Sequence, residues 1–176
     1  MHLKAEICRL LDRIELILQQ LKAVEAIRDE LLIAPPVNAA APACPASLMQ
    51  LRGIGPDFAN VLWSEGLYRH FGNRRELASY AGLATTPWQS GTIDRMQGVS
   101  QAGNPRLRTV MVQISWFWLL HQRESALTRW FHQRVELDGG RRKKPAIIAL
   151  ARKLLIALWK FVRHGVVIEG AVLKHA

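Results

Sequence analysis

Residues 48–62 place two glycines between two short apolar runs, in the order Leu-Met-Gln-Leu-Arg-Gly-Ile-Gly-Pro-Asp-Phe-Ala-Asn-Val-Leu. Pro56 follows the second glycine, and proline is favoured at the first position of a helix. Gly53 and Gly55 permit backbone conformations that other residues resist. The stretch therefore predicts a short helix, a glycine turn and a second helix. The apolar side chains expected to pack between the two helices are Leu51, Ile54, Ala59 and Leu62.

This glycine turn also predicts an anion site. The first N–H groups of a helix point outward, and the helix dipole favours a phosphate in front of them. The segment resembles the helix-hairpin-helix module, which holds nucleic-acid backbones without reading their sequence. We therefore expect Gly53, Ile54 and Gly55 to contact DNA or RNA. The alternative is a glycine turn that only connects two core helices.

The rest of the chain after residue 50 predicts more helices, so the fold class is all-α. Residues 76–82 form a short helix that Gly82 ends, and Asn104 and Pro105 begin a longer one. Residues 145–164 form another, with apolar side chains at helical spacing. Residues 83–104 show little periodicity and predict an irregular connection, which at this length is usually functional. We expect the following aromatic side chains in the core rather than as base-stacking platforms: Trp116, Phe117, Trp118, Trp130 and Phe131.

The N-terminal segment has a 3.5-residue apolar repeat from Leu3 to Leu31, formed by Leu3, Ile7, Leu10, Ile14, Ile17, Leu21, Val24 and Leu31. This period predicts a left-handed coiled coil and a homodimer or higher oligomer through residues 3–31. The alternative is an amphipathic helix packed on the chain's own domain. Pro35, Pro36, Pro42 and Pro45 end the helix. The expected organisation is a helix at 1–34, a linker at 35–47, a domain at 48–164 and a tail at 165–176.

The charge is concentrated in the C-terminal part of the chain. The 176 residues carry a formal net charge of +10, but residues 1–34 contribute −1 and residues 51–176 contribute +11. Nucleic acid, with DNA first, is therefore the expected partner of the C-terminal part. Because phosphates attract clustered cations, we expect contacts from these basic side chains of the loop and last helix: Arg141, Arg142, Lys143, Lys144, Arg152 and Lys153.

Composition excludes several other classes of protein. No apolar run approaches the 18 to 20 residues of a membrane span, and the N-terminus lacks the layout of a signal peptide. Cys8 and Cys44 form no disulfide framework or zinc pattern, which is typical of a reducing compartment. We therefore expect a cytoplasmic protein without a membrane partner and without a metal site or cofactor of its own.

Five motifs in fixed order resemble one family. They are Leu-Arg-Gly-Ile-Gly-Pro at 51–56, Leu-Ala-Ser-Tyr-Ala-Gly-Leu at 77–83, Gln-Ser-Gly at 89–91, Gly-Asn-Pro-Arg-Leu-Arg at 103–108 and Ala-Leu-Ala-Arg-Lys-Leu-Leu at 149–155. Residues 48–162 thereby resemble the C-terminal domain of the IS110 group of transposases, relatives of the Piv invertase. The resemblance implies DNA transposition and recombination of an insertion sequence. It also implies that a structured guide RNA directs some members.

The resemblance further implies a catalytic serine. Family members join a RuvC-like domain, which holds Mg²⁺ on an acidic tetrad, to a helical linker and a C-terminal domain whose serine attacks the DNA phosphodiester. Ser90 stands at the serine position, framed by residues 80–83 and 104–108. A serine needs a base or metal for its proton and cations for the pentacovalent phosphate. The nearest candidate cations are Arg95, Arg106 and Arg108; the alternative is that Ser90 and Gly91 only form a turn.

The chain departs from the family at its N-terminus. No segment with the strands and spaced carboxylates of a RuvC-like domain precedes residue 48, so we expect a fragment or one part of a split enzyme. The principal alternative function is a catalytically inactive nucleic-acid-binding remnant or accessory module. A third is an assembly protein that acts through its coiled coil alone.

Overall fold

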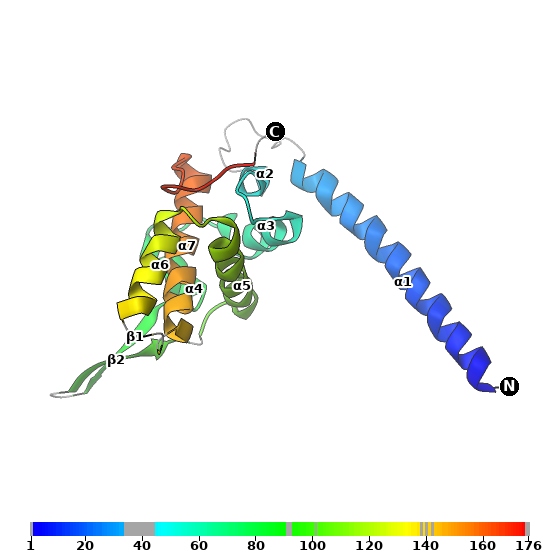
Figure 1. The fold of residues 1–176 in the computed structure, drawn as a ribbon, viewed down its shortest axis with the longest axis horizontal. Coiled ribbons are helices and arrows are strands. Elements are labelled where there is room, and N and C mark those ends of the chain that lie inside the picture. The colour runs from blue at the N-terminus through cyan, green and yellow to red at the C-terminus, as the bar shows by residue number, and fades with distance from the viewer. Residues whose placement is uncertain are drawn as a thin grey trace. The chain divides into compact units, whose positions relative to one another are not determined.

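The computed structural model describes residues 2–33, 45–90, 93–100, 102–137, 139, 141 and 143–174, and the side chains within these ranges except those of 2, 33 and 86–97. The chain divides into two compact units, Met1–Pro35 and Pro36–Ala176 (Figure 1). Most of the linker expected at 35–47 lies outside the described residues.

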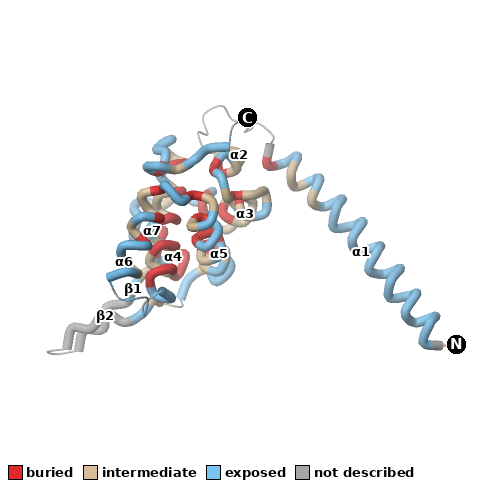
Figure 2. Tube along the Cα trace, viewed as in Figure 1, coloured by how far each residue is buried: buried red, intermediate tan, exposed pale blue. Residues whose placement is uncertain are grey.

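The first unit is one helix, α1, at His2–Ile33. Its apolar side chains are exposed along most of its length, as the pale blue tube of Figure 2 shows. Leu3 is 70% exposed, Ile14 53% and Leu21 50%. The helix therefore presents the 3.5-residue stripe, and its pairing with another helix stays a prediction.

The second unit contains the remaining elements. In chain order they are α2 (Pro45–Met49), α3 (Pro56–Leu62), the π-helical turn η1 (Trp63–Leu67), α4 (Arg74–Tyr80), β1 (Thr85–Ser90), β2 (Ile93–Val99), α5 (Pro105–His121), α6 (Ala126–Leu137) and α7 (Lys143–His164). Most described residues are helical, which confirms the predicted all-α class.

Helix α7 lies at the centre of this unit and packs against α2, α4, α5 and α6. Its buried side chains follow one another at helical spacing, with Leu150, Leu154 and Leu158 fully buried. Burying one such side chain is worth roughly 1.5–3 kcal/mol. The apolar stripe read from residues 145–164 thus forms the core on which the other helices are arranged.

The irregular connection expected at 83–104 is wrong for residues 85–90 and 93–99, which form an antiparallel hairpin that extends from the helices (Figure 1). Ser90 pairs with Ile93, Trp88 with Arg95 and Thr85 with Val99, with an irregularity between Thr85 and Pro87. The strands were missed because polar residues fill them and hide the alternation of a half-buried strand. Proline is tolerated because each strand of a two-stranded sheet is an edge.

The aromatic side chains divide between core and surface. Trp118 and Phe131 are buried, and Trp130 is half-buried. The core prediction is wrong for Trp116 and Phe117, each 43% exposed. Adjacent helix positions differ by about 100° in direction, so α5 turns Trp118 inward and these two neighbours outward.

The segment expected as a tail at 165–176 packs back onto the glycine turn. Residues Leu51 and Leu173 form an antiparallel bridge. The buried Gln122 amide donates from Nε2 to the carbonyls of Arg52 (2.7 Å) and Val172 (2.9 Å), and its Oε1 accepts from the Val172 N–H (2.7 Å). The compact unit therefore continues through Lys174, whose ammonium donates to the Ile54 carbonyl at 2.8 Å.

Candidate nucleic-acid interface

A cleft lies where the base of the hairpin meets α5 and α7. Its larger part, about 630 Å³, is lined by Leu83, Val99, Ser100, Arg108, Thr109, Val112, Gln113, Lys144, Ile147 and Ile148. A second part of about 370 Å³ shares Lys144 and continues to Arg152. Three cations from two helices therefore border one concave surface. None of the described residues that line it is acidic. We call this surface the hairpin-base cleft.

Arg108 reaches the cleft across a glycine. Gly82 has φ +64°, and its position leaves no space for a side chain: a Cβ there would lie 2.8 Å from an Arg108 guanidinium nitrogen and 2.6 Å from the Ala102 carbonyl oxygen. Gly103, at φ +115°, packs as closely from the other side, because its Cβ would lie 2.6 Å from the Gly82 nitrogen. These contacts explain why the motif at 77–83 and the motif at 103–108 each contain a glycine at this point.

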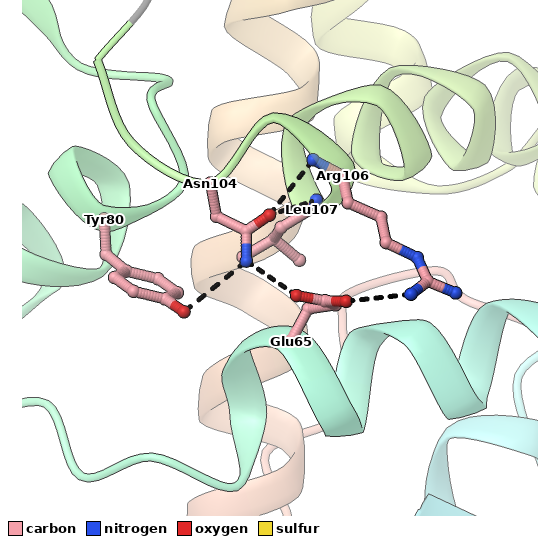
Figure 3. A network of polar contacts seen from close by, with 5 residues as sticks. All are labelled: Glu65, Tyr80, Asn104, Arg106 and Leu107. Atoms are coloured by element: carbon pink, nitrogen blue, oxygen red, sulfur yellow. Dashed lines mark hydrogen bonds and ion pairs between the residues drawn. The ribbon is translucent and has the colours of Figure 1, made fainter.

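Asn104 connects the same two motifs through polar contacts (Figure 3). Its Oδ1 caps α5 by accepting from the Arg106 and Leu107 N–H groups at 3.0 Å each. Its Nδ2 donates to Glu65 Oε2 at 2.8 Å and to the Tyr80 hydroxyl at 3.4 Å. Arg106 pairs with the other Glu65 oxygen at 3.2 Å. The network fixes the start of α5, on which Arg108 is carried.

Ser90 and Arg95 lie on the hairpin, and their side chains are outside those described. Ser90 is the last residue of β1, and Arg95 is opposite Trp88 on β2. At about 3.3 Å per strand residue, Ser90 lies roughly 17 Å along β1 from Thr85 at the base. Arg106 and Arg108 begin α5 near that base. The structure thus does not bring the expected serine and these two arginines into one cluster.

The glycine turn is partly occupied by internal hydrogen bonds. Ile54 is fully buried, and its N–H donates to the Leu51 carbonyl at 3.2 Å. Gly53 has φ +97°, and a Cβ there would lie 3.2 Å from the Cβ of His121. Gly55 is extended at the start of α3, with open space where a Cβ would stand. Of the three residues expected to contact a nucleic acid, Gly55 has the most open surroundings, and Ile54 packs in the core.

The basic residues of the loop and α7 face different surroundings. Lys144 and Arg152 line the hairpin-base cleft. Lys143 lies over the Trp116 ring, 5.6 Å from its centroid, and Lys153 lies over the Trp130 ring at 4.7 Å. Arg141 is exposed, and Arg142 lies outside the described residues. The predicted basic patch is therefore divided between the cleft and two aromatic surfaces.

Sequence reasoning missed two polar residues of the cleft, Thr109 and Gln113. They stand four positions apart on α5, so helical spacing could have placed these two side chains on one face with each other. The hairpin also had a signal. Ser90 and Ile93, the last and first paired residues, are separated by two residues including Gly91, a typical hairpin connection length.

The described residues contain no group of three or more His, Cys, Asp or Glu side chains that could hold a metal ion. Among the same residues, no helix is both long and apolar enough to cross a bilayer.

Sequence comparison relates part of this helical unit to transposases. Residues 46–131 match the family described as "Transposase IS116/IS110/IS902 family". This match supports the family resemblance that the motifs of residues 48–162 indicated.

Two relatives extend the comparison. The protein named "Putative transposase y4rJ" of Sinorhizobium fredii is 61% identical over 179 aligned positions, covering 98% of this chain and 45% of that protein. The "Insertion element IS110 uncharacterized 43.6 kDa protein" of Streptomyces coelicolor is 30% identical over 153 positions, covering 86% of this chain and 35% of that protein. The chain thus spans less than half the length of these relatives.

Proposed function

We propose that this chain is the nucleic-acid-binding part of an IS110-type transposase and that it holds DNA in the hairpin-base cleft. The observation that carries the proposal is the convergence of Arg108, Lys144 and Arg152 on one concave surface without an acidic residue among the described lining. A net charge of +11 over residues 51–176 adds long-range attraction.

In this proposal the three cations contact phosphates and the apolar walls exclude water beside them. Phosphate contacts position a protein on DNA without reading its sequence. Each neutralised phosphate contributes about −0.9 to the slope of log K against log salt. Binding should therefore weaken steeply as salt rises, and a flat salt response would contradict the proposal.

Substitution of the cleft cations tests the site. Lys144→Ala and Arg152→Ala should each weaken duplex binding at every sequence and reduce the salt slope by about one. Lys160→Ala is the matched control, because Lys160 is exposed on the same helix but does not line the cleft. Equal losses from Lys144→Ala and Lys160→Ala would indicate diffuse attraction and not a cleft site.

We further propose that Ser90 is the nucleophile of the complete enzyme. Its Oγ would form a bond to a DNA phosphorus while one P–O bond of the DNA breaks. The serine proton goes to a base, and the leaving oxygen takes a proton. The carboxylates for this step belong to the RuvC-like domain of the family. Arg95 pairs with Trp88, two residues before Ser90 on β1. In this proposal Arg95 stabilises the charge that develops on the phosphate. Arg106 and Arg108 lie nearer the hairpin base.

The chemistry is tested by adding a relative's RuvC-like domain and trapping protein–DNA adducts on gapped substrates. The Ser90→Ala variant should lose the adduct and retain binding. An adduct that persists in this variant excludes Ser90. A wild-type chain that binds DNA and forms no adduct in that mixture favours the binding module without chemistry.

Two further partners belong to this proposal. A structured guide RNA would compete with DNA for the basic surface, and competition binding with RNA transcribed from the element's flanks tests it. A second copy of the chain would cover the exposed stripe of α1. Sedimentation equilibrium of the full chain measures that association.

A further inference from the structure

Helix α1 carries information on how two copies would pair. The apolar stripe repeats every 3.5 residues from Leu3 to Leu31, and one position in it is Arg28 instead of an apolar residue. Along one edge of the stripe, every seventh residue reads Lys4, Leu11, Leu18 and Glu25. Leu11 is 58% exposed and Leu18 51%, so the apolar surface widens at the middle of the helix and ends in opposite charges.

Parallel pairing does not suit this pattern. In a parallel pair each stripe position meets its own copy, so the two Arg28 guanidinium groups would share one layer. The edge residues would meet the opposite edge of the second copy, with Glu6 beside Leu11 and Arg13 beside Leu18. These contacts bring like charges together and place charged groups against exposed leucines.

We propose that two copies of α1 pair in antiparallel orientation, with Ile14 of one copy opposite Ile17 of the other. In this register Lys4 lies beside Glu25 of the second copy and Leu11 beside its Leu18. Two-fold symmetry repeats both contacts, so two ion pairs flank four leucines. Arg28 lies opposite Leu3 of the second copy at the end of the paired region, where its guanidinium can reach solvent.

Shifting the register by one heptad removes these contacts. One shift brings Arg13 against Arg13 of the second copy, and the other moves Arg28 inward against Leu10. The opposite edge of the preferred register carries no like-charge contact, since it places Arg13 beside Gln20 and Glu6 beside Ile27. The pairing of opposite charges and the contact between the exposed leucines therefore favour the same register, with Ile14 opposite Ile17.

This inference rests on the homodimer proposed above and adds its orientation. In an antiparallel pair the two chains leave the helices at opposite ends, roughly 50 Å apart for helices of this length. In a parallel pair both chains would leave at the same end. The orientation therefore determines whether the two DNA-binding units start from the same or from opposite ends of the paired helices.

A reciprocal charge exchange in the full-length chain tests the orientation. Lys4→Glu and Glu25→Lys should each raise the dimer dissociation constant about tenfold at low salt, since each replaces two attractive pairs by two repulsive ones. The double variant should return to within about twofold of wild type. Lys4 and Glu25 lie roughly 30 Å apart along one helix, so this recovery cannot arise within one copy.

Lys22→Glu is the control, because it makes the same charge change on the outer face of α1 and should leave dimerisation unchanged. A double variant as weak as either single variant, with a dimeric wild type, would overturn the antiparallel orientation and leave the homodimer in place. A monomeric wild-type chain would overturn both. Sedimentation equilibrium supplies every one of these dissociation constants.

Discussion

The two units of this chain use apolar side chains in opposite ways. Helix α1 exposes leucine and isoleucine on a nearly neutral helix, whereas the second unit buries its leucines beneath a strongly basic surface. Residues 2–33 contain no glycine, while Gly82 and Gly103 are central to the packing of the second unit. The comparison indicates that the second unit is stabilised by its own core, whereas a partner that covers the stripe of α1 stays a prediction.

The largest expected effect is on the free energy of unfolding, and a leucine-to-alanine substitution should produce it in the second unit but not in α1. Leu154→Ala should lower the free energy of unfolding of the second unit by about 2–5 kcal/mol, because Leu154 is fully buried. Leu10→Ala in α1 should leave it unchanged, since Leu10 is 51% exposed. Tryptophan fluorescence during urea unfolding measures this unit specifically, as all six tryptophans follow residue 50. A comparable loss from Leu10→Ala would show that α1 is part of the same cooperative unit.

The Gly103→Ala variant tests the close backbone contacts of the second unit, which have no counterpart in α1. Its Cβ would lie 2.6 Å from the Tyr80 carbonyl oxygen in a backbone at φ +115°, so the expected loss is about 2–4 kcal/mol. Gly98→Ala is the control, because nothing lies within 4 Å of its Cβ position. Equal thermal midpoints for the two variants would contradict this account of the motif.

A smaller effect is expected where a side chain caps a helix of the second unit. Asn104→Ala removes the cap of α5 and the hydrogen bond to Glu65, and should cost about 1–2 kcal/mol. Asn73→Ala removes the cap of α4 at an exposed site and should cost about 1 kcal/mol or less. Urea denaturation of both variants gives the comparison, and a larger cost at Asn73 would contradict the importance of the network around Glu65.

The smallest effect on the stability of the second unit is expected from deletion of α1. Removing residues 1–33 should change the unfolding free energy of the second unit by less than about 0.5 kcal/mol, because the two units are separately compact. DNA affinity per unit should also largely survive, while self-association is lost. Loss of DNA binding by the isolated second unit at equal protein concentration would place essential contacts in α1.

Several features could be predicted from residues alone because their causes are local. Asn104 and Pro105 start α5 as expected, since a cap and a fixed φ act within one turn. Gly82 ends the segment after α4, at φ +64°. The hairpin could not be read in the same way, because its strands are stabilised by each other and lack a one-sided apolar pattern. Its catalytic role stays a prediction that rests on Ser90.

The amino-acid sequence determined the apolar period of α1 and the separation of charge between the two parts of the chain, because both depend only on the order of residues. The tertiary structure alone decided which cations share a surface. Arg108 and Lys144 are far apart in sequence and meet in the hairpin-base cleft because α5 packs against α7. It also decided that Trp116 faces outward while Trp118 faces inward. A side chain's surroundings depend on the elements packed around it, and no local pattern contains them.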